Sequence, residues 1–328
     1  MWLMLRTALL IMCVFQAFAQ RPEALAQWPE ALAQWPEFYK QVSRITWVTR
    51  DADRTAAAWT KFGLTDAEPR GEVALPIEYR GKPLTARARW TTARIGAVAV
   101  DLLEPVADTG ALGDHLARHG EGIVALLHEA GSREAFDREV DRMRALGVGI
   151  LQRGSEPVPY VWFDTAERGK YVVGLVLGAP RGEGPGRIGQ FAFAVRDAAP
   201  VAAYWKSLGW PAMTVSRSVP RGMEVHGKPA SYELEIWWQR HGAVPYEWCV
   251  APAGLTSVYG EFVARHGEGV QHLGIAVPDM DRAIAEKGFA VAQSGAWGEA
   301  GKPGSGRFAY LDTDAAGGVT AELLWSFR

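Results

Sequence analysis

The sequence predicts an α+β protein of four modules, each reading as a strand, a helix and several further strands, grouped into two related halves. The main observation is a repeat, because the hexapeptide Ala-Arg-His-Gly-Glu-Gly at Ala117–Gly122 recurs unchanged at Ala264–Gly269, 147 residues later. A second pattern, Glu-x-x-Gly-Lys-Pro, starts at Glu78 and again at Glu224, 146 residues later. Self-similarity at a fixed spacing marks a duplicated unit, so both halves are expected to share one fold.

The composition is that of a globular protein with a small-molecule site. The chain has 328 residues, of which 48% are hydrophobic and 22% charged, enough for two domains of ordinary size. The net charge of −2 gives no reason to expect nucleic acid as a partner. Of the two cysteines, Cys13 lies in a segment predicted to be removed, which leaves Cys249 as a single thiol without an internal disulfide.

The first 19 residues predict a signal peptide. Arg6 precedes an apolar run over 7–15, and Ala17-Phe18-Ala19 forms a small-x-small cleavage site. The run is far shorter than the roughly 20 residues of a spanning helix, so we expect cleavage, a secreted or periplasmic protein, and no membrane association afterwards. Residues 20–42 form a leader with a short tandem repeat whose units begin with Pro22 and Pro29, and a continuous helix would be interrupted at Pro29 and Pro36.

Hydrophobic runs and helix-ending glycines place the elements of the four modules in order. In the first module the pattern predicts a strand at 45–48, a helix at 55–62 before Gly63 and a last strand at 97–103; in the third it predicts a strand at 191–195, a helix ending at Leu208 and a last strand at 246–250. In the second module, which spans 123–177, it predicts a helix at 133–146. In the fourth module, which spans 270–325, it predicts a helix at 279–287. A Gly-rich link at 180–186 separates domains predicted at 43–179 and 187–328, and a second Gly-rich stretch, 294–306, predicts a loop.

Two stretches of the fourth module carry a family signature. His266–Asp279, which reads His-Gly-Glu-Gly-Val-Gln-His-Leu-Gly-Ile-Ala-Val-Pro-Asp, and Ala309–Leu324, with its Gly-Gly before a strand containing Glu322, resemble the start and end of a metal-bearing module of the vicinal oxygen chelate superfamily. This superfamily includes glyoxalases, methylmalonyl-CoA epimerase, extradiol dioxygenases and bleomycin-resistance proteins, and the module is most similar to the epimerase and glyoxalase branch. The resemblance implies four βαβββ modules that form two glyoxalase-like domains, with one divalent metal inside a cup-shaped sheet.

The resemblance also implies the metal ligands, position by position. The fourth module supplies His272 and Glu322, and the third supplies Gln190. The fourth ligand stays open, because the repeat shift changes from 146 to 147 before Pro252, so that Glu247 or Trp248 faces the site; one step along a strand reverses the direction of the side chain. With Glu247 the set resembles that of glyoxalases, and with Trp248 it resembles the three-ligand layout of extradiol dioxygenases.

We favour Glu247, since a tryptophan cannot bind a metal ion. The matching positions of the first half are Arg44, Asp101, Ala125 and Gly174, so domain 43–179 is expected to be metal-free and to serve as a scaffold or lid.

Together with the predicted signal peptide, the resemblance implies an exported, metal-dependent enzyme of the isomerase, epimerase or lyase type. Its small oxygenated substrate would form an enolate stabilised by the metal, with Glu322 or Glu247 as the catalytic base. The metal would be Ni, Zn, Mn, Co or Fe. Two alternatives remain: an Fe(II) extradiol-type dioxygenase and a non-catalytic protein that binds a small molecule. The sequence leaves open whether two chains pair into a homodimer.

Other conspicuous side chains have structural as well as functional interpretations. The chain contains 14 tryptophans, and those of the second half, among them Trp205 and Trp248, could line an aromatic pocket or fill a β-rich core. Tyr310 is a candidate acid, base or orienting phenol. His119 and His266 belong to the repeated hexapeptide, and we expect them to have a structural role because the metal-free half keeps its copy.

Overall fold

The computed structural model describes residues 35–107, 109–178, 188–242 and 244–327. Residues Glu37–Arg328 form one compact unit, to which the following account is restricted. The predicted signal peptide, most of the leader and the predicted link at 180–186 lie outside the described residues. Within the described ranges, no helix combines the length and the apolar character needed to cross a membrane.

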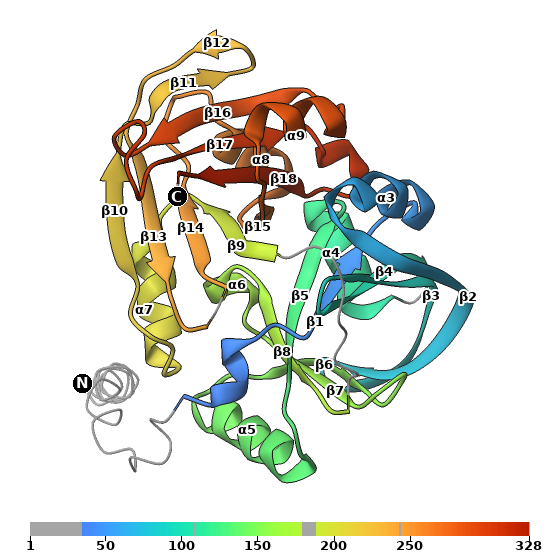
Figure 1. Ribbon diagram of the computed structural model, residues 1–328. Coiled ribbons are helices and arrows are strands. Elements are labelled where there is room, and N and C mark those ends of the chain that lie inside the picture. The colour runs from blue at the N-terminus through green and yellow to red at the C-terminus, as the bar shows by residue number, and fades with distance from the viewer. Residues whose placement is uncertain (1–34, 108, 179–187, 243, 328) are drawn as a thin grey trace, which may run out of the picture. The chain divides into compact units, whose positions relative to one another are not determined.

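The strands of the first half close into a barrel of eight (Figure 1). In barrel order these are β1 (Arg44–Val48), β4 (Val98–Ala107), β3 (Lys82–Ile95), β2 (Leu64–Tyr79), β6 (Ile150–Gly154), β7 (Tyr160–Phe163), β8 (Val172–Val176) and β5 (Gly122–Glu129). The helical segments are η2 (Glu37–Lys40), α3 (Ala52–Trp59), η3 (Thr60–Phe62), α4 (Gly110–His119), α5 (Arg133–Ala145) and α6 (Ala166–Gly169).

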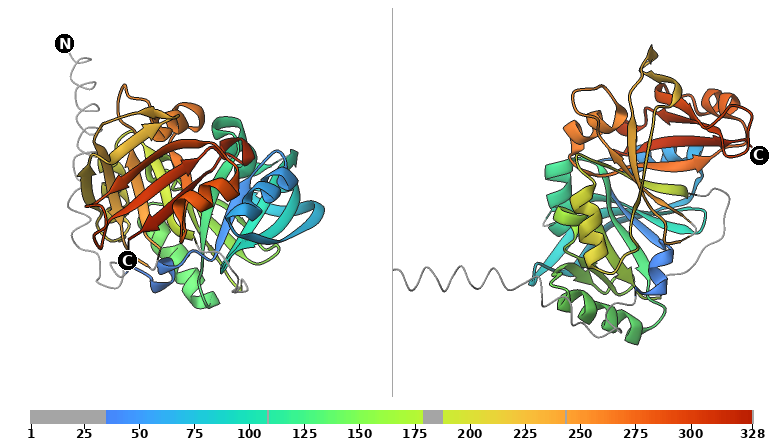
Figure 2. Two further views of the ribbon diagram at one scale, coloured as in Figure 1. Left: turned by 45° about the horizontal axis from the view of Figure 1, so that its top comes forward. Right: turned by 90° about the vertical axis from the view of Figure 1, so that its left-hand side faces the viewer.

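The second half forms a curled ten-stranded sheet, drawn in yellow to red in Figure 2. Its order is β10 (Thr214–Ser218), β13 (Leu234–Gln239), β14 (Tyr246–Val250), β9 (Ile188–Val195), β15 (Gly269–Ala276), β18 (Thr320–Ser326), β17 (Gly306–Leu311), β16 (Val291–Trp297), β11 (Arg221–Val225) and β12 (Lys228–Pro229). Its helical segments are α7 (Ala199–Ser207), α8 (Val258–His266), α9 (Met280–Lys287) and η4 (Asp314–Ala316).

The two sheets confirm the predicted α+β class with four related modules. Every barrel strand falls within 43–179 and every strand of the other sheet within 187–328, while the domain boundaries themselves stay a prediction. The halves differ where the long strand β2 is replaced by two short strands, β10 and β11. Pro220 lies between them.

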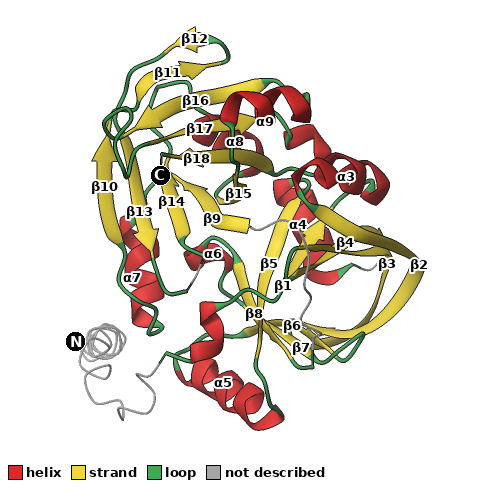
Figure 3. Cartoon of the chain, viewed as in Figure 1, coloured by secondary structure: helices red, strands yellow, loops and turns green. Residues whose placement is uncertain are grey.

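Local sequence accounts for the helices, several of which lie along the outer sides of the sheets (Figure 3). Asp51 and Asp279 each accept a backbone N–H three residues on, at 2.8 and 3.0 Å, and so cap the N-termini of α3 and α9. Gly63 and Gly288 end these segments in the left-handed conformation. The loop predicted over 294–306 is wrong in its first part, because strand β16 continues to Trp297 through its pairing with β17.

Trp205 and Trp248 of the second half lie in a core rather than in a pocket. The rings of Trp248 and Phe193 stack at 4.0 Å, and Trp205 stacks at 4.9 Å on Tyr171 of the first half. Trp205 also donates its Nε1–H to the carbonyl oxygen of Gly169 at 3.2 Å. Both tryptophans are fully buried, so this aromatic cluster joins the two halves.

The repeated hexapeptide joins the halves at a second place. Nδ1 of His119 lies 2.7 Å from the carbonyl oxygen of His266, and Nδ1 of His266 lies 2.7 Å from the carbonyl oxygen of His119. The glutamates of the two copies act alike, since Glu121 accepts the backbone N–H of Arg50 and Glu268 accepts that of Arg196. The identical sequences therefore form a symmetric contact between equivalent helix ends.

Candidate metal centre

Strand register decides which residue faces the cup. Glu247 pairs with Ala192 across β14 and β9, and Asp101 pairs with Thr46 in the same way across β4 and β1. Glu247 is thus the counterpart of Asp101 at a shift of 146, and this register continues to Val250, so the extra residue of the second half lies beyond β14. Trp248 points to the opposite face, where it packs on Phe193.

The neighbouring strand pair brings in the other two donors. His272 of β15 pairs with Thr320, and Glu322 of β18 pairs with Gly274. A glycine is required at 274, because a Cβ there would lie 2.3 Å from Cγ of Gln190. Gln190, on β9, can therefore extend across β15 toward His272 and Glu322.

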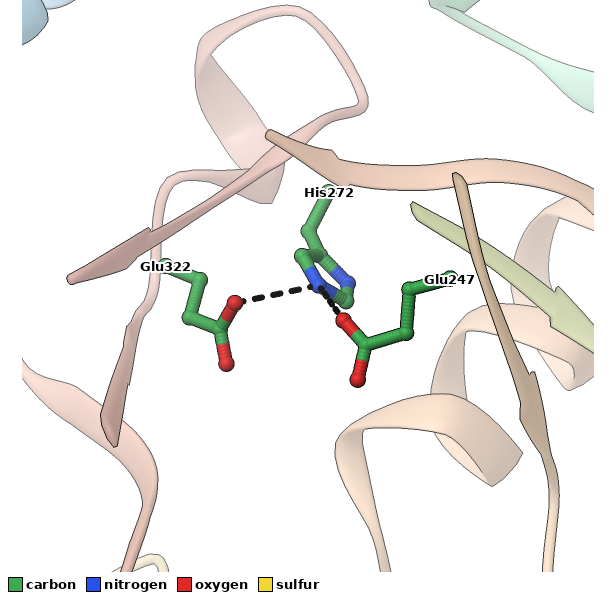
Figure 4. A group of neighbouring side chains, drawn as sticks. All are labelled: Glu247, His272 and Glu322. Atoms are coloured by element: carbon green, nitrogen blue, oxygen red, sulfur yellow. Dashed lines mark ion pairs between the residues drawn. The ribbon is translucent and has the colours of Figure 1, made fainter. Parts of the chain in front are cut away.

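The structure brings together all four residues that the sequence singles out. Nε2 of His272 lies 3.3 Å from Oε2 of Glu247 and 3.3 Å from Oε2 of Glu322 (Figure 4). Nε2 of Gln190 lies 2.6 Å from Oε2 of Glu322 and 3.4 Å from Nε2 of His272, and it also donates to Glu247. Each of the four side chains is at least 94% buried.

Burial and the neighbouring charges shift the pKa values of Glu247 and His272. Burial raises the pKa of Glu247, and the charge of Glu322 raises it further, against the lowering effect of His272. Burial lowers the pKa of His272, but the charges and hydrogen bonds of Glu322 and Glu247 outweigh this effect and raise it to about 9. Two buried carboxylates thus share one cationic side chain, an arrangement that a divalent ion would compensate.

The donor set fits a divalent transition metal ion. The ligand atoms of Glu247, His272 and Glu322 all lie within 4.8 Å of one another. Bonds of about 2.0–2.2 Å to nitrogen and oxygen would separate neighbouring ligand atoms by about 3.3 Å at a tetrahedral centre, which is the separation between Nε2 of His272 and Oε2 of each glutamate. Turning the Gln190 amide by 180° places its oxygen, a possible ligand, where Nε2 lies.

Tyr310 packs against His272 and helps to orient it. Its ring meets the imidazole edge-on at 5.0 Å, and its hydroxyl shares a 2.7 Å hydrogen bond with Tyr259, a residue that the sequence did not single out. Burial raises the pKa of Tyr310 well above its usual value, so the phenol stays protonated. Cys249 is also buried, and burial raises the pKa of its thiol, which makes it an unreactive group.

In the first half an ion pair takes the place of the four donors. The NH1 group of Arg44 donates to both carboxylate oxygens of Asp101, at 2.7 and 2.8 Å. Register places Ala125 and Gly174 at the positions of His272 and Glu322, since Ala125 pairs with Val172 and Leu127 with Gly174. A guanidinium therefore supplies the positive charge, and no nitrogen or carboxylate is offered by Ala125 or Gly174.

The second half thus combines paired strand–helix–strand modules with four possible metal ligands inside one curled sheet, an arrangement found in a class of proteins that bind small molecules at such a site. Residues 189–310 match the family model of the Glyoxalase/Bleomycin resistance protein/Dioxygenase superfamily. The second half therefore belongs to this superfamily, whose members are the vicinal oxygen chelate proteins, and the resemblance seen in the sequence is confirmed. Comparison with curated protein sequences gives no match.

Solved structures show the same fold across both halves. A mutant of 4-hydroxymandelate synthase from Streptomyces coelicolor is similar with a TM-score of 0.54 at 15% identity, covering 88% of this chain and 92% of that one. A xylose isomerase-like TIM barrel/4-hydroxyphenylpyruvate dioxygenase fusion protein has a TM-score of 0.53 at 12% identity, covering 88% of this chain and 49% of that one. At such identities the similarity concerns the fold alone.

Proposed function

We propose that this protein is a metal-dependent enzyme of the isomerase, epimerase or lyase type that acts on a small oxygenated molecule in the second half. The observation that carries this proposal is the convergence of Gln190, Glu247, His272 and Glu322 on one buried point. A buried pair of carboxylates with a single histidine is costly unless a cation compensates it. We also propose export through the predicted signal peptide, which N-terminal sequencing of the mature protein would test.

The four residues would hold the ion and also move a proton. A bound divalent ion supplies Lewis-acid polarisation of a substrate oxygen. Glu247 and Glu322 lie on opposite sides of His272, so either carboxylate could remove a proton from the carbon next to that oxygen and return it. Both carboxylates are buried, and burial raises the pKa of Glu247, as a base working near neutral pH needs.

The donor set favours this chemistry over ring-cleaving dioxygenation. Iron(II) oxygenases typically use two histidines and one carboxylate, with positions left open for oxygen and substrate. Here His272 is the one histidine among the four donors, and Gln190 and Glu247 occupy two further positions. We therefore place the dioxygenase second.

Metal content is the first measurement. The full mature protein, purified without chelators or a metal-binding tag, should contain about one divalent ion per chain by mass spectrometry. His272→Ala should abolish this binding without unfolding the protein. A matched control is His128→Ala, because His128 is also a buried strand histidine but lies in the barrel and contacts the carbonyl oxygen of Gln41 at 2.8 Å.

The reaction class is tested with the metal-loaded protein. Hydrogen exchange at the carbon next to the carbonyl of α-hydroxy ketones, followed by NMR in D2O, should depend on Glu247 and Glu322. Oxygen uptake with catechols and Fe(II) would support the dioxygenase instead. Absence of a bound ion, even after incubation with Mn, Co, Ni, Zn and Fe(II), would refute the metal enzyme and favour a protein that only binds small molecules.

A further inference from the structure

Strand β15 contains a bulge beside the candidate metal ligand. Val270 pairs with Phe193 and His272 pairs with Ala192, so Gln271 is an extra residue in the ladder. The first half has the same bulge, since Ala125 pairs with Thr46 and Ile123 pairs with Trp47, which leaves Val124 as the extra residue of β5.

The bulge turns the Gln271 side chain back toward the histidine that follows it. Oε1 of Gln271 lies 2.5 Å from Nδ1 of His272, and Nε2 of Gln271 donates to Oγ1 of Thr320 at 3.1 Å. Gln271 is fully buried and Thr320 nearly so. With its Nε2 bound to Thr320, the amide presents an acceptor to His272, so Nδ1 carries the hydrogen and Nε2 faces Glu247 and Glu322.

The first half supplies an internal comparison. Val124 stands at the position of Gln271, and Val172, which pairs with Ala125, stands at the position of Thr320, which pairs with His272. The backbone is therefore the same in both halves, but the polar pair occurs in the half that has the histidine. The bulge therefore forms without the polar pair.

We propose that Gln271, supported by Thr320, is a positioning residue that fixes the tautomer and ring orientation of His272, so that the Nε2 lone pair points at the metal. This inference rests on the proposed metal site. A metal-bound histidine commonly donates its other ring N–H to a fixed acceptor, and loss of that acceptor typically lowers metal affinity by roughly 10–100-fold.

The test compares Zn²⁺ affinity by competition with a chromophoric chelator. Gln271→Met keeps the length and removes the acceptor, so we expect a loss of roughly 10–100-fold. Gln271→Glu restores an acceptor oxygen and should regain most of the affinity. Gln239→Met is the matched control, because Gln239 is a fully buried strand glutamine that donates to the carbonyl oxygen of Pro211 and should leave the affinity unchanged.

A second readout reports the tautomer directly. In the zinc-loaded protein, 15N NMR of His272 should show a protonated Nδ1 in the wild type and increased solvent exchange of that proton in Gln271→Met. Equal affinity and equal spectra for the two proteins would overturn this inference and leave the metal site intact. A wild-type protein that binds no zinc would overturn the proposed function, and the inference with it.

Discussion

Replacing Arg44 by Met should destabilise the first half strongly. Arg44 binds both carboxylate oxygens of Asp101, and the two side chains are each 10% exposed. After the substitution the Asp101 carboxylate keeps, among the described residues, one hydrogen bond, from Nε1 of Trp90 at 3.0 Å, and it loses the ion-pair partner Arg44. Removing one partner of a buried ion pair typically costs about 3–5 kcal/mol, and we expect that loss in the free energy of unfolding.

The double variant Arg44→Met/Asp101→Leu separates charge from packing. Both charges are then absent, and the main remaining defect is the indole N–H of Trp90, which loses its acceptor. A buried donor without a partner costs about 1–3 kcal/mol, so the double variant should be more stable than Arg44→Met alone.

Urea unfolding at neutral pH, followed by tryptophan fluorescence and by circular dichroism, measures these differences. The metal content of all variants should match that of the wild type, since the pair lies in the other half. Two results would refute the idea that the guanidinium replaces a metal cation here. One is a loss of less than about 1 kcal/mol in the free energy of unfolding for Arg44→Met; the other is a loss for the double variant that equals the sum of the losses for Arg44→Met and Asp101→Leu.

Further outcomes follow from the register and from the contact between the halves. Glu247→Gln should lower metal affinity by more than about tenfold in a chelator competition, since it changes a ligand itself, while Trp248→Ala should cost about 3–5 kcal/mol in urea unfolding and leave the affinity alone. His266 has acceptors at both ring nitrogens, the His119 carbonyl and Asp314. Burial lowers the pKa of His266, but these bonds outweigh it and raise the pKa, so its stabilisation is complete below about pH 6.5 and is lost as pH rises through the folded pKa. The free energy of unfolding of the wild type should therefore decrease as the pH rises above about 6.5, and that of His266→Gln should change less.

Periodic features of the sequence predicted the α+β modules, and the family resemblance predicted how they combine. The repeated hexapeptide predicted the duplication, and the glycines just beyond α3, α5 and α9 placed those helices to within three residues. The resemblance also named three of the four candidate site residues. The exception was the choice between Glu247 and Trp248, which one inserted residue left open and which required the strand pairing to resolve.

Contacts between distant segments could not be predicted in this way. Tyr259 of α8 reaches the centre through one apolar cluster and a hydrogen bond that it shares with Tyr310, and nothing in its local sequence signals that contact. The predicted leader shows the same limit, since Tyr39 is buried and donates to Glu139, 100 residues away, at 2.7 Å. Such side chains are placed by tertiary packing, for which hydrophobic periodicity carries no information.

Side-chain size on two adjacent strands opposes a glutamate at position 174 of the first half. In the second half a small residue on β15, Gly274, lies beside a large one on β18, Glu322; in the first half the sizes are reversed, with Leu127 on β5 beside Gly174 on β8. A Cβ at 174 would lie 2.6 Å from Cδ2 of Leu127 and 2.5 Å from a backbone carbonyl oxygen. A glutamate there would therefore clash with the strand before it could reach a metal. The packing around Gly174, together with the charge of Arg44, thus disfavours a metal ligand at this place in the first half.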